Sequence, residues 1–320
     1  MEETLRWIFP AEMQKVFETV CLQQSKISEI RLRAMRPVLI RRSGEEWFLE
    51  ENGRLTKSPD PAAKISVKQL QTILDRACQN SPYAYEEELK NGFLTIRGGH
   101  RIGVTGQVVT EGEKKIRTQK YITGLNIRVA HEVSTAADDI LPQIYRKGQV
   151  LSVLILSPPG CGKTTFLRAL IRRVSDGNPY GVGRSVGVVD ERSEIAGAYQ
   201  GEFAYDLGLR TDILDACPKQ AGINLLLRSM SPEVIAVDEI GEQGDYELLR
   251  KLSTCGCKLF ATAHGDSLQD ILRKFVLTRQ ELGAVFDRVV LLEKRDGKCQ
   301  VKAVEALEDE TCIGRSLRER

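Results

Sequence analysis

The sequence predicts an α/β protein with a mostly parallel sheet, preceded by a smaller α+β domain. Three observations lead to this fold class. From about residue 150 onward, short apolar runs alternate with segments of helical periodicity, as in parallel strands that helices cover on both faces. A glycine-rich turn joins the first of these strands to the next helix. Before residue 130, strands with period-two alternation are mixed with helices.

The first part contains two segments with helical periodicity. Residues 11–21 place Met13, Phe17 and Val20 on one face, and residues 66–78 do the same behind Ser66. A serine directly before an apolar-periodic segment is a preferred N-cap. We therefore expect a helix in each range, with Ser66 capping the second.

Strands are predicted between and after these helices. Residues 27–49 alternate with period two and contain turn signals at Arg36-Pro37 and Ser43-Gly44. Residues 92–109 predict a hairpin that turns at Gly98-Gly99, and residues 122–130 predict another strand.

We place the domain boundary where the polar residues after 130 begin, which gives an α+β domain over 1–132 and an α/β domain over 133–320. Residues 138–148 are counted as the first helix of the second domain. The expected strands are 150–156, 185–191, 233–239, 258–264 and 288–293, and the expected helices are 163–175, 245–255 and 268–275.

Composition excludes several classes of protein. The formal net charge of the 320 residues is only +2, whereas non-specific nucleic-acid binders normally carry a strong basic excess. The eight cysteines are scattered without a CxxC pair, which argues against zinc and for reduced thiols in a cytosolic protein. No apolar run approaches the roughly 18 residues of a membrane span. We expect a soluble, cytoplasmic chain.

The segment SPPGCGKT, Ser157 to Thr164, is one residue short of the phosphate-loop pattern GxxxxGK[ST]. Ser157 replaces the first glycine, but an apolar strand precedes the segment and an amphipathic helix follows it. The alternative is a plain glycine turn between a strand and a helix.

The chemistry of a nucleoside triphosphate explains this spacing. Glycines let the backbone turn its N–H groups toward phosphates, and the following helix directs its positive end at them. Lys163 would reach the β- and γ-phosphates, Thr164 would bind Mg²⁺, and Thr165 would contact the α-phosphate. The expected nucleotide-binding residues are Ser157, Pro158, Pro159, Gly160, Cys161, Gly162, Lys163, Thr164 and Thr165.

A second apolar strand ends in the acids that such a loop requires. Val234–Val237 precede Asp238 and Glu239. Asp238 would hold Mg²⁺, and Glu239 would polarise the attacking water. Acids are also common at strand ends without any catalytic role.

Two further groups are candidates with open alternatives. The strand at 185–191 ends in acids, and Glu191 and Glu194 are candidates near the metal, although an acidic cluster at a helix start would look the same. His264 ends a later strand and either senses the γ-phosphate or is structural.

Taken in order, SPPGCGKTT, VVDERSEI, EVIAVDEIG and TAHG resemble the phosphate loop, Asp box, Walker B and His box of the type II and type IV secretion ATPase superfamily. Longer segments, including LRTDILDACPKQAG and GFLTIRGGHRIGVTGQ, resemble the stage III sporulation AA family within it. The resemblance covers nearly the whole chain.

The resemblance implies a RecA-like domain and a Mg²⁺-dependent ATPase of the mother-cell cytoplasm. It further implies a homo-hexamer that drives a secretion-like channel to the forespore through membrane-embedded partners. Arginines of the N-terminal domain would reach the phosphates, which makes Arg101 and Arg128 candidates, and Arg228 is a third. Such an arginine can raise turnover by ~10³ to 10⁵.

The chain also departs from the superfamily. Walker B there usually reads Gly-Glu, whereas Asp238 precedes Glu239 here, and the Asp box is DERSE rather than EDPxE. Two other functions are alternatives. A RecA-like nucleic-acid-dependent ATPase needs a basic groove with aromatic residues, and the basic clusters have few of these, so no nucleic acid is expected. A non-hydrolysing ATP switch would need a damaged catalytic set.

Overall fold

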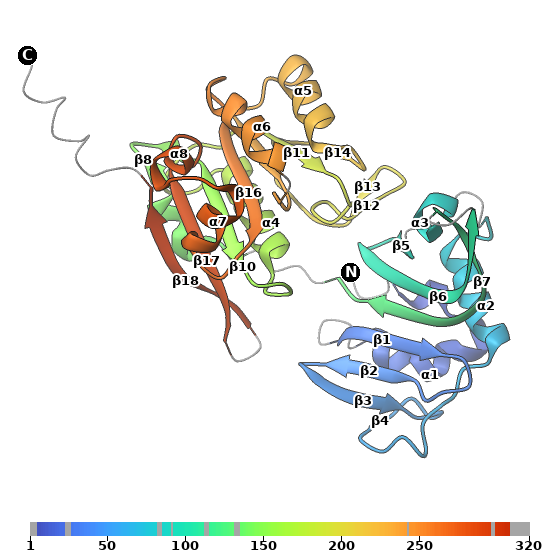
Figure 1. Ribbon diagram of the computed structural model, residues 1–320. Coiled ribbons are helices and arrows are strands. Elements are labelled where there is room, and N and C mark those ends of the chain that lie inside the picture. Colours follow the sequence, from blue (N-terminus) through green and yellow to red (C-terminus); the bar gives the residue numbers. More distant parts are fainter. Residues whose placement is uncertain are drawn as a thin grey trace, which may run out of the picture. The chain divides into compact units, whose positions relative to one another are not determined.

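The computed structural model describes residues 5–22, 27–81, 85–90, 92–111, 115–130, 135–241, 243–295 and 298–307. The chain forms two compact units (Figure 1). The first comprises residues up to 131 together with Gly197–Ala204, and the second comprises the remainder. The boundary expected after residue 132 and the basic segment at 314–320 lie outside the described ranges.

The first unit is built on a seven-stranded antiparallel sheet with the order β4-β3-β2-β1-β7-β6-β5. Its strands are β1 (Ile27–Arg33), β2 (Leu39–Arg42), β3 (Glu45–Leu49), β4 (Leu55–Thr56), β5 (Phe93–Ile96), β6 (His100–Glu111) and β7 (Lys115–Arg128). The expected turns are confirmed: Ser43 and Gly44, and Gly98 and Gly99, all have positive φ, which tight hairpin turns require.

Helices of the first unit complete its core. They are η1 (Arg6–Ile8), α1 (Ala11–Leu22), α2 (Val67–Ala77) and α3 (Glu86–Lys90). The N-cap prediction is confirmed, because Ser66 Oγ accepts the Gln69 N–H at 3.2 Å and Gln69 Oε1 accepts the Ser66 N–H at 2.9 Å. Phe9 and Phe17 stack with ring centroids 4.1 Å apart inside this core.

A short hairpin from the middle of the chain also belongs to the first unit. It consists of β12 (Ala198–Tyr199) and β13 (Glu202–Phe203). The Tyr199 hydroxyl accepts a hydrogen bond from Gln79 Nε2 at 2.6 Å and lies 3.2 Å from the Tyr85 hydroxyl, while the Tyr199 ring packs on the core.

The second unit contains the predicted parallel sheet, with the order β14-β11-β15-β16-β10-β17-β18. Only β18 runs antiparallel to its neighbour. In Figure 1 the green β10 lies between the orange β16 and the red β17. The strands are β10 (Val153–Ser157), β11 (Val186–Asp190), β14 (Thr211–Asp215), β15 (Val234–Val237), β16 (Lys258–His264), β17 (Arg288–Arg295) and β18 (Lys298–Ala306).

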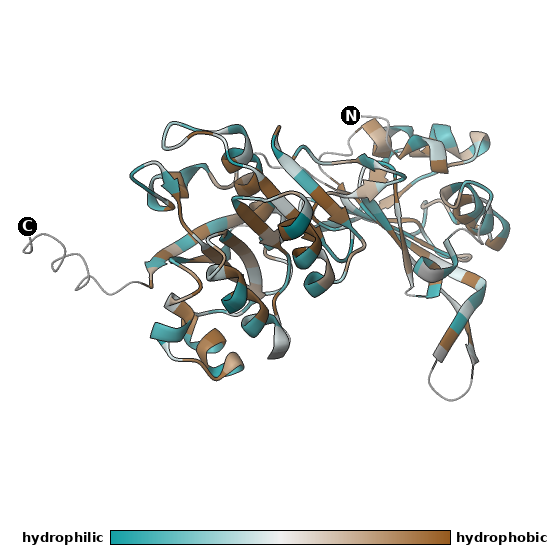
Figure 2. Cartoon of the chain, turned by 90° about the horizontal axis from the view of Figure 1, so that it is seen from above, coloured by the Kyte–Doolittle hydropathy of each residue, from teal (hydrophilic) through white to brown (hydrophobic). Residues whose placement is uncertain are grey.

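Helices pack on both faces of this sheet. Leu154 and Leu156 point to the core shared with α5 (Lys219–Ser229), α6 (Gln243–Ser253), α7 (Leu268–Phe275) and α8 (Arg279–Gly283). Residues that alternate with them point to the other face, where α4 (Lys163–Asp176) contacts the sheet. In Figure 2 the central strands are mostly brown, whereas the helices carry both colours.

One element prediction is wrong. Instead of a helix over 138–148, the chain forms a 3-10 helix η4 (Asp138–Gln143) followed by β8 (Tyr145–Arg146) and β9 (Gln149–Val150). Pro142 lacks the N–H that would continue an α-helix through this stretch. The sequence reasoning also missed β14, α5, α8 and β18. Within the described residues, no helix is long and apolar enough to cross a membrane.

Candidate functional site

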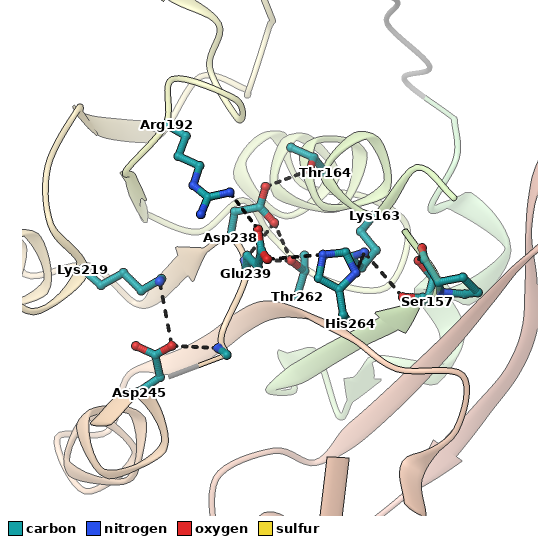
Figure 3. Close-up of polar contacts among 12 residues, drawn as sticks. Ser157, Lys163, Thr164, Arg192, Lys219, Asp238, Glu239, Asp245, Thr262 and His264 are labelled. Carbon is teal, nitrogen blue, oxygen red and sulfur yellow. Dashed lines mark hydrogen bonds and ion pairs between the residues drawn. The ribbon is translucent and has the colours of Figure 1, made fainter. Parts of the chain in front are cut away.

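Three neighbouring strands and one helix bring the candidate residues of the second unit together. Strands β10, β15 and β16 are parallel neighbours, so their carboxyl ends meet at one edge of the sheet. Ser157 ends β10, Asp238 follows β15, His264 ends β16, and Lys163 begins α4. In Figure 3 the Lys163 and His264 side chains point toward each other, and Ser157 contacts Lys163 through its carbonyl oxygen. This edge is where parallel α/β sheets commonly bind ligands.

The glycine-rich loop has the backbone that phosphate binding requires. Gly160 and Gly162 have φ of 71° and 93°, in the left-handed region that favours glycine. Pro158 and Pro159 are exposed, Cys161 is buried, and Thr165 is half-buried on the first turn of α4. The N-terminus of α4 therefore opens onto the loop, as in sites for anions.

Lys163, His264 and Glu239 form a continuous polar chain. Lys163 Nζ lies 3.0 Å from His264 Nδ1 and 3.5 Å from the Ser157 carbonyl oxygen. His264 Nε2 lies 3.3 Å from Glu239 Oε1. A lysine ammonium has only donors, so Nδ1 accepts and the proton of a neutral ring faces Glu239. The histidine thus connects the loop lysine to the acidic residue.

Lys163 is unusually enclosed for a lysine. It is 8% exposed, and burial lowers the pKa of its ammonium, while the Asp238 and Glu239 carboxylates oppose that fall. A buried ammonium needs nearby anions to offset its lost hydration. The loop thus holds a cation where a phosphate group would be stabilised.

Asp238 joins the loop helix to the neighbouring strand. Its Oδ2 accepts a hydrogen bond from Thr164 Oγ1 at 2.8 Å, and its Oδ1 accepts a short one from Thr262 Oγ1. Thr262 is fully buried on β16. Sequence reasoning missed Thr262, although it lies two residues before His264 and therefore shares its face of the strand.

Glu239 has a strained backbone. Its φ is 45°, a region that costs an L-residue with a Cβ roughly 1–2 kcal/mol. The conformation is held because its N–H donates to Thr262 Oγ1 at 2.9 Å and to Asp238 Oδ1 at 3.0 Å. Strained residues of this kind cluster at functional sites. Here the strain directs the carboxylate toward His264.

Arg192 is a second residue that sequence reasoning missed. Its Nη1 lies 3.2 Å from Glu239 Oε2. The glutamate is therefore held from two sides, by an imidazole on one oxygen and a guanidinium on the other (Figure 3). The sequence shows Arg192 inside the DERSE segment but carries no signal for its contact with Glu239.

Asp190 ends β11, and its carboxylate accepts hydrogen bonds from the turn that follows. Oδ1 accepts the Glu194 N–H at 2.9 Å, and Oδ2 accepts those of Ile195 and Ala196 at 2.8 and 2.9 Å. Burial raises the pKa of this carboxyl to about 6, although the three N–H groups act in the opposite direction. The role of Asp190 in the structure is to fix the turn that carries Arg192.

Glu191 faces a lysine rather than the polar chain. Lys219 Nζ lies 2.7 Å from Glu191 Oε2, and the Lys219 N–H donates to Oε1 at 3.0 Å. The same ammonium lies 3.8 Å from Asp245 Oδ2, which accepts the Gly241 N–H at 2.8 Å. Lys219 thereby links the turn after β11 to the first turn of α6, where Asp245 lies.

The remaining candidates lie elsewhere. Arg228 is exposed on the last turn of α5. Arg101 and Arg128 are partners in the register of β6 and β7 in the first unit, where the Arg101 guanidinium lies 3.9 Å above the Phe93 ring. For Glu194, the structure gives a backbone contact to Asp190.

The chain matches the model of a protein family described as "Sporulation stage III, protein AA" over residues 1–311. It is 38% identical over 300 residues to "Stage III sporulation protein AA" of Bacillus subtilis (strain 168), covering 93% of this chain and 92% of that one. The fold is similar to those of two solved proteins. The Legionella pneumophila ATPase DotB matches with a TM-score of 0.62 at 17% identity, covering 94% of this chain and 82% of DotB. The pilus retraction motor PilT, solved with bound ADP, matches with a TM-score of 0.60 at 15% identity, covering 92% of this chain and 84% of PilT.

Proposed function

Because the chain belongs to the sporulation stage III protein AA family, we propose that it is the ATP-hydrolysing motor of a secretion-like channel between mother cell and forespore. The RecA-like fold that it shares with DotB and PilT supports this proposal. The similarity to the Bacillus subtilis protein named for stage III of sporulation supports a role in spore formation.

One observation carries the catalytic part of the proposal. The Lys163 ammonium, the His264 imidazole and the Glu239 carboxylate form an unbroken chain from the glycine-rich loop to the end of β15. An ammonium beside the loop suits the β- and γ-phosphates, and a carboxylate next to it suits the orientation of a water molecule. Hydrolysis of ATP needs both functions at adjacent positions.

The donor atoms also fit Mg²⁺. Thr164 Oγ1 and Asp238 Oδ2 lie 2.8 Å apart at the start of α4, and hydroxyl and carboxylate oxygens are the ligands that Mg²⁺ prefers. We assign Thr164 and Asp238 to the metal. A bound Mg²⁺ would neutralise phosphate charge, and the chain itself would supply Lys163 and Glu239 as positioning and water-orienting groups.

We further propose that the motor acts as a hexameric ring at the membrane. The phosphates would receive arginines from the N-terminal unit, with Arg101 and Arg128 as the candidates because they lie side by side on β6 and β7. Hydrolysis would then drive movement of a membrane-embedded partner. Domain closure around a nucleotide is a common way to obtain such movement.

The experiment is a steady-state ATPase assay of the full chain over a hundredfold range of protein concentration, with Glu239→Gln and Lys163→Ala as inactive references. We expect Mg²⁺-dependent turnover that both substitutions abolish. A rate per chain that rises with concentration supports sites completed by neighbouring copies. A constant rate would overturn the ring, and equal turnover in Lys163→Ala would overturn the ATPase itself.

A further inference from the structure

Two cysteine side chains that are far apart in the sequence meet at the glycine-rich loop. Cys161 lies within the loop, and Cys299 lies on β18, where its register partner on β17 is Lys294. The Cys299 side chain packs against Gly162, the residue that follows Cys161, and the Cys161 thiol is close enough to affect the electrostatic environment of the Cys299 thiol. Both are free cysteines, Cys161 buried and Cys299 on an exposed residue.

The packing of the next residue shows how closely β18 approaches the loop. A Cβ added to Gly162 would lie 3.3 Å from Cys299 Cβ and 3.5 Å from Cys299 Sγ. The first distance is tighter than most Cβ contacts, and the second is an ordinary van der Waals contact. The strand therefore lies directly against the backbone that would receive the phosphates, with a sulfur at the point of contact.

We propose that Cys161 and Cys299 are a paired-thiol modification site at which oxidation by a peroxide forms a disulfide that closes the nucleotide loop. Two thiols and one hydrogen peroxide give one disulfide and two waters. In the first step the Cys299 sulfur is oxidised to a sulfenic acid and one water leaves. In the second, Cys161 attacks that sulfur, the S–S bond forms, and the sulfenic oxygen leaves as the second water.

The alternative of a bound metal lacks ligands. Within the described part of the chain, no three His, Cys, Asp or Glu side chains come together as a metal-binding group. Two cysteines without a third ligand suit a disulfide better than a stable zinc site, which takes four ligands in structural centres.

The bond would change the loop. A disulfide holds its sulfurs about 2.05 Å apart and its Cβ atoms roughly 3.5–4.5 Å apart, so the bond would fix the loop to β18. Gly160 and Gly162 make the loop backbone easy to displace, since both have positive φ. Displaced N–H groups no longer converge on phosphates. This consequence rests on the proposed function, whereas the formation of the bond does not.

The environment of the pair sets the rate of reaction. Burial of the Cys299 sulfur, reinforced by the neighbouring Cys161, raises the pKa of its thiol well above the ordinary range. The thiolate is the reactive form. We therefore expect slow reaction at pH 7, with a rate that rises about tenfold for each pH unit below that pKa.

The test treats the full chain with hydrogen peroxide and then follows two readouts. Non-reducing peptide mapping measures the linkage, and titration with a fluorescent ATP analogue measures nucleotide affinity. We expect a Cys161–Cys299 peptide, at least a tenfold loss of affinity, and recovery with dithiothreitol. Cys299→Ser is expected to bind nucleotide normally and to keep its affinity after peroxide. Cys255→Ser, which removes another exposed thiol, is expected to behave like the natural sequence.

Two results would overturn the proposal. One is the absence of the linked peptide after peroxide at pH 9, and the other is an equal loss of affinity in Cys299→Ser. Failure of the proposed function is distinguishable, because the reduced protein would then bind no nucleotide while the peptide map still decides whether the bond forms.

Discussion

The Arg192 guanidinium and the Glu239 carboxylate form an ion pair of 3.2 Å between the turn after β11 and the end of β15. Arg192 is 65% exposed and Glu239 is 42% exposed, so the pair adds only about 0–1 kcal/mol to stability. Its value lies in placing a positive charge beside the residue that would orient water, on the same chain and without help from another subunit.

Arg192→Ala is therefore expected to lower kcat for ATP at least tenfold while the KM and the unfolding midpoint stay almost unchanged. A developing phosphate charge loses a nearby cation in this variant. The assay is steady-state ATP hydrolysis beside urea denaturation. The control is Arg250→Ala, because Arg250 is similarly exposed at 61% and also pairs with a glutamate, Glu247. Equal activity of both variants would remove Arg192 from the site.

Glu239→Gly is expected to be more stable than Glu239→Ala by about 1 kcal/mol, the reverse of the usual order, because only the alanine keeps the cost of positive φ. Both variants lack the carboxylate, so the comparison isolates the backbone. Urea denaturation measures the difference. A more stable alanine variant would mean that the backbone at Glu239 is not strained in solution.

Lys219→Met is expected to destabilise the fold by roughly 1–3 kcal/mol, because Glu191 and Asp245 then lose their shared cation in a partly buried place. Glu191→Gln added to Lys219→Met is expected to recover part of that loss, since it removes one unpaired charge. Thermal or urea unfolding of the two single variants and of the double variant completes a double-mutant cycle. Purely additive effects would show that the ion pair contributes nothing.

Asp190 predicts an unusual pH dependence. Its pKa in the folded chain is about 6, above the ordinary aspartate value, because burial outweighs its three N–H partners. The folded state thus binds a proton between about pH 4 and 6 where the unfolded state does not, so this group makes stability fall as pH rises through that window.

The measurement is the stability of the natural sequence minus that of Asp190→Asn. We expect this difference to grow by about 1 kcal/mol when the pH falls from 7 to 5. Asp190→Asn itself is expected to be less stable, because an amide offers one acceptor oxygen to three N–H groups. A difference independent of pH would place the pKa of Asp190 near its ordinary value.

The sequence predicted the helices and strands whose residue pattern is local. The helix expected at 268–275 is α7 with the same bounds, and the glycine-rich loop enters α4 at Lys163 as expected. It missed α5, which contains Gly222, a residue of poor helix propensity. The structure explains that glycine: a Cβ there would lie 2.6 Å from Val189 Cγ1. Close packing on β11, invisible in the sequence, determines the residue.

The same limit applies to the site. The neighbourhood of Lys163, Asp238 and His264 was predictable because each residue stands at the end of a parallel strand or the start of the helix between them. The contact of Arg192 with Glu239 was not, because it depends on a turn in which Ser193 has a φ of 51°. The strand β18 that carries Cys299 lies at the edge of the sheet beside β17, so tertiary pairing rather than propensity defines it.

The hairpin of Gly197–Ala204 belongs to the first unit, although the chain on both sides of it belongs to the second. The chain leaves the second unit after Ala196 and returns to it at Tyr205, while Tyr199 completes the core of the first. A gene fusion that joined the residues after 132 to a different N-terminal domain would therefore carry the hairpin with it. That domain would lack the Gln79 and Tyr85 side chains that Tyr199 contacts. We expect the units to be inherited together, and a protease cut between them to leave two fragments that co-migrate until denatured.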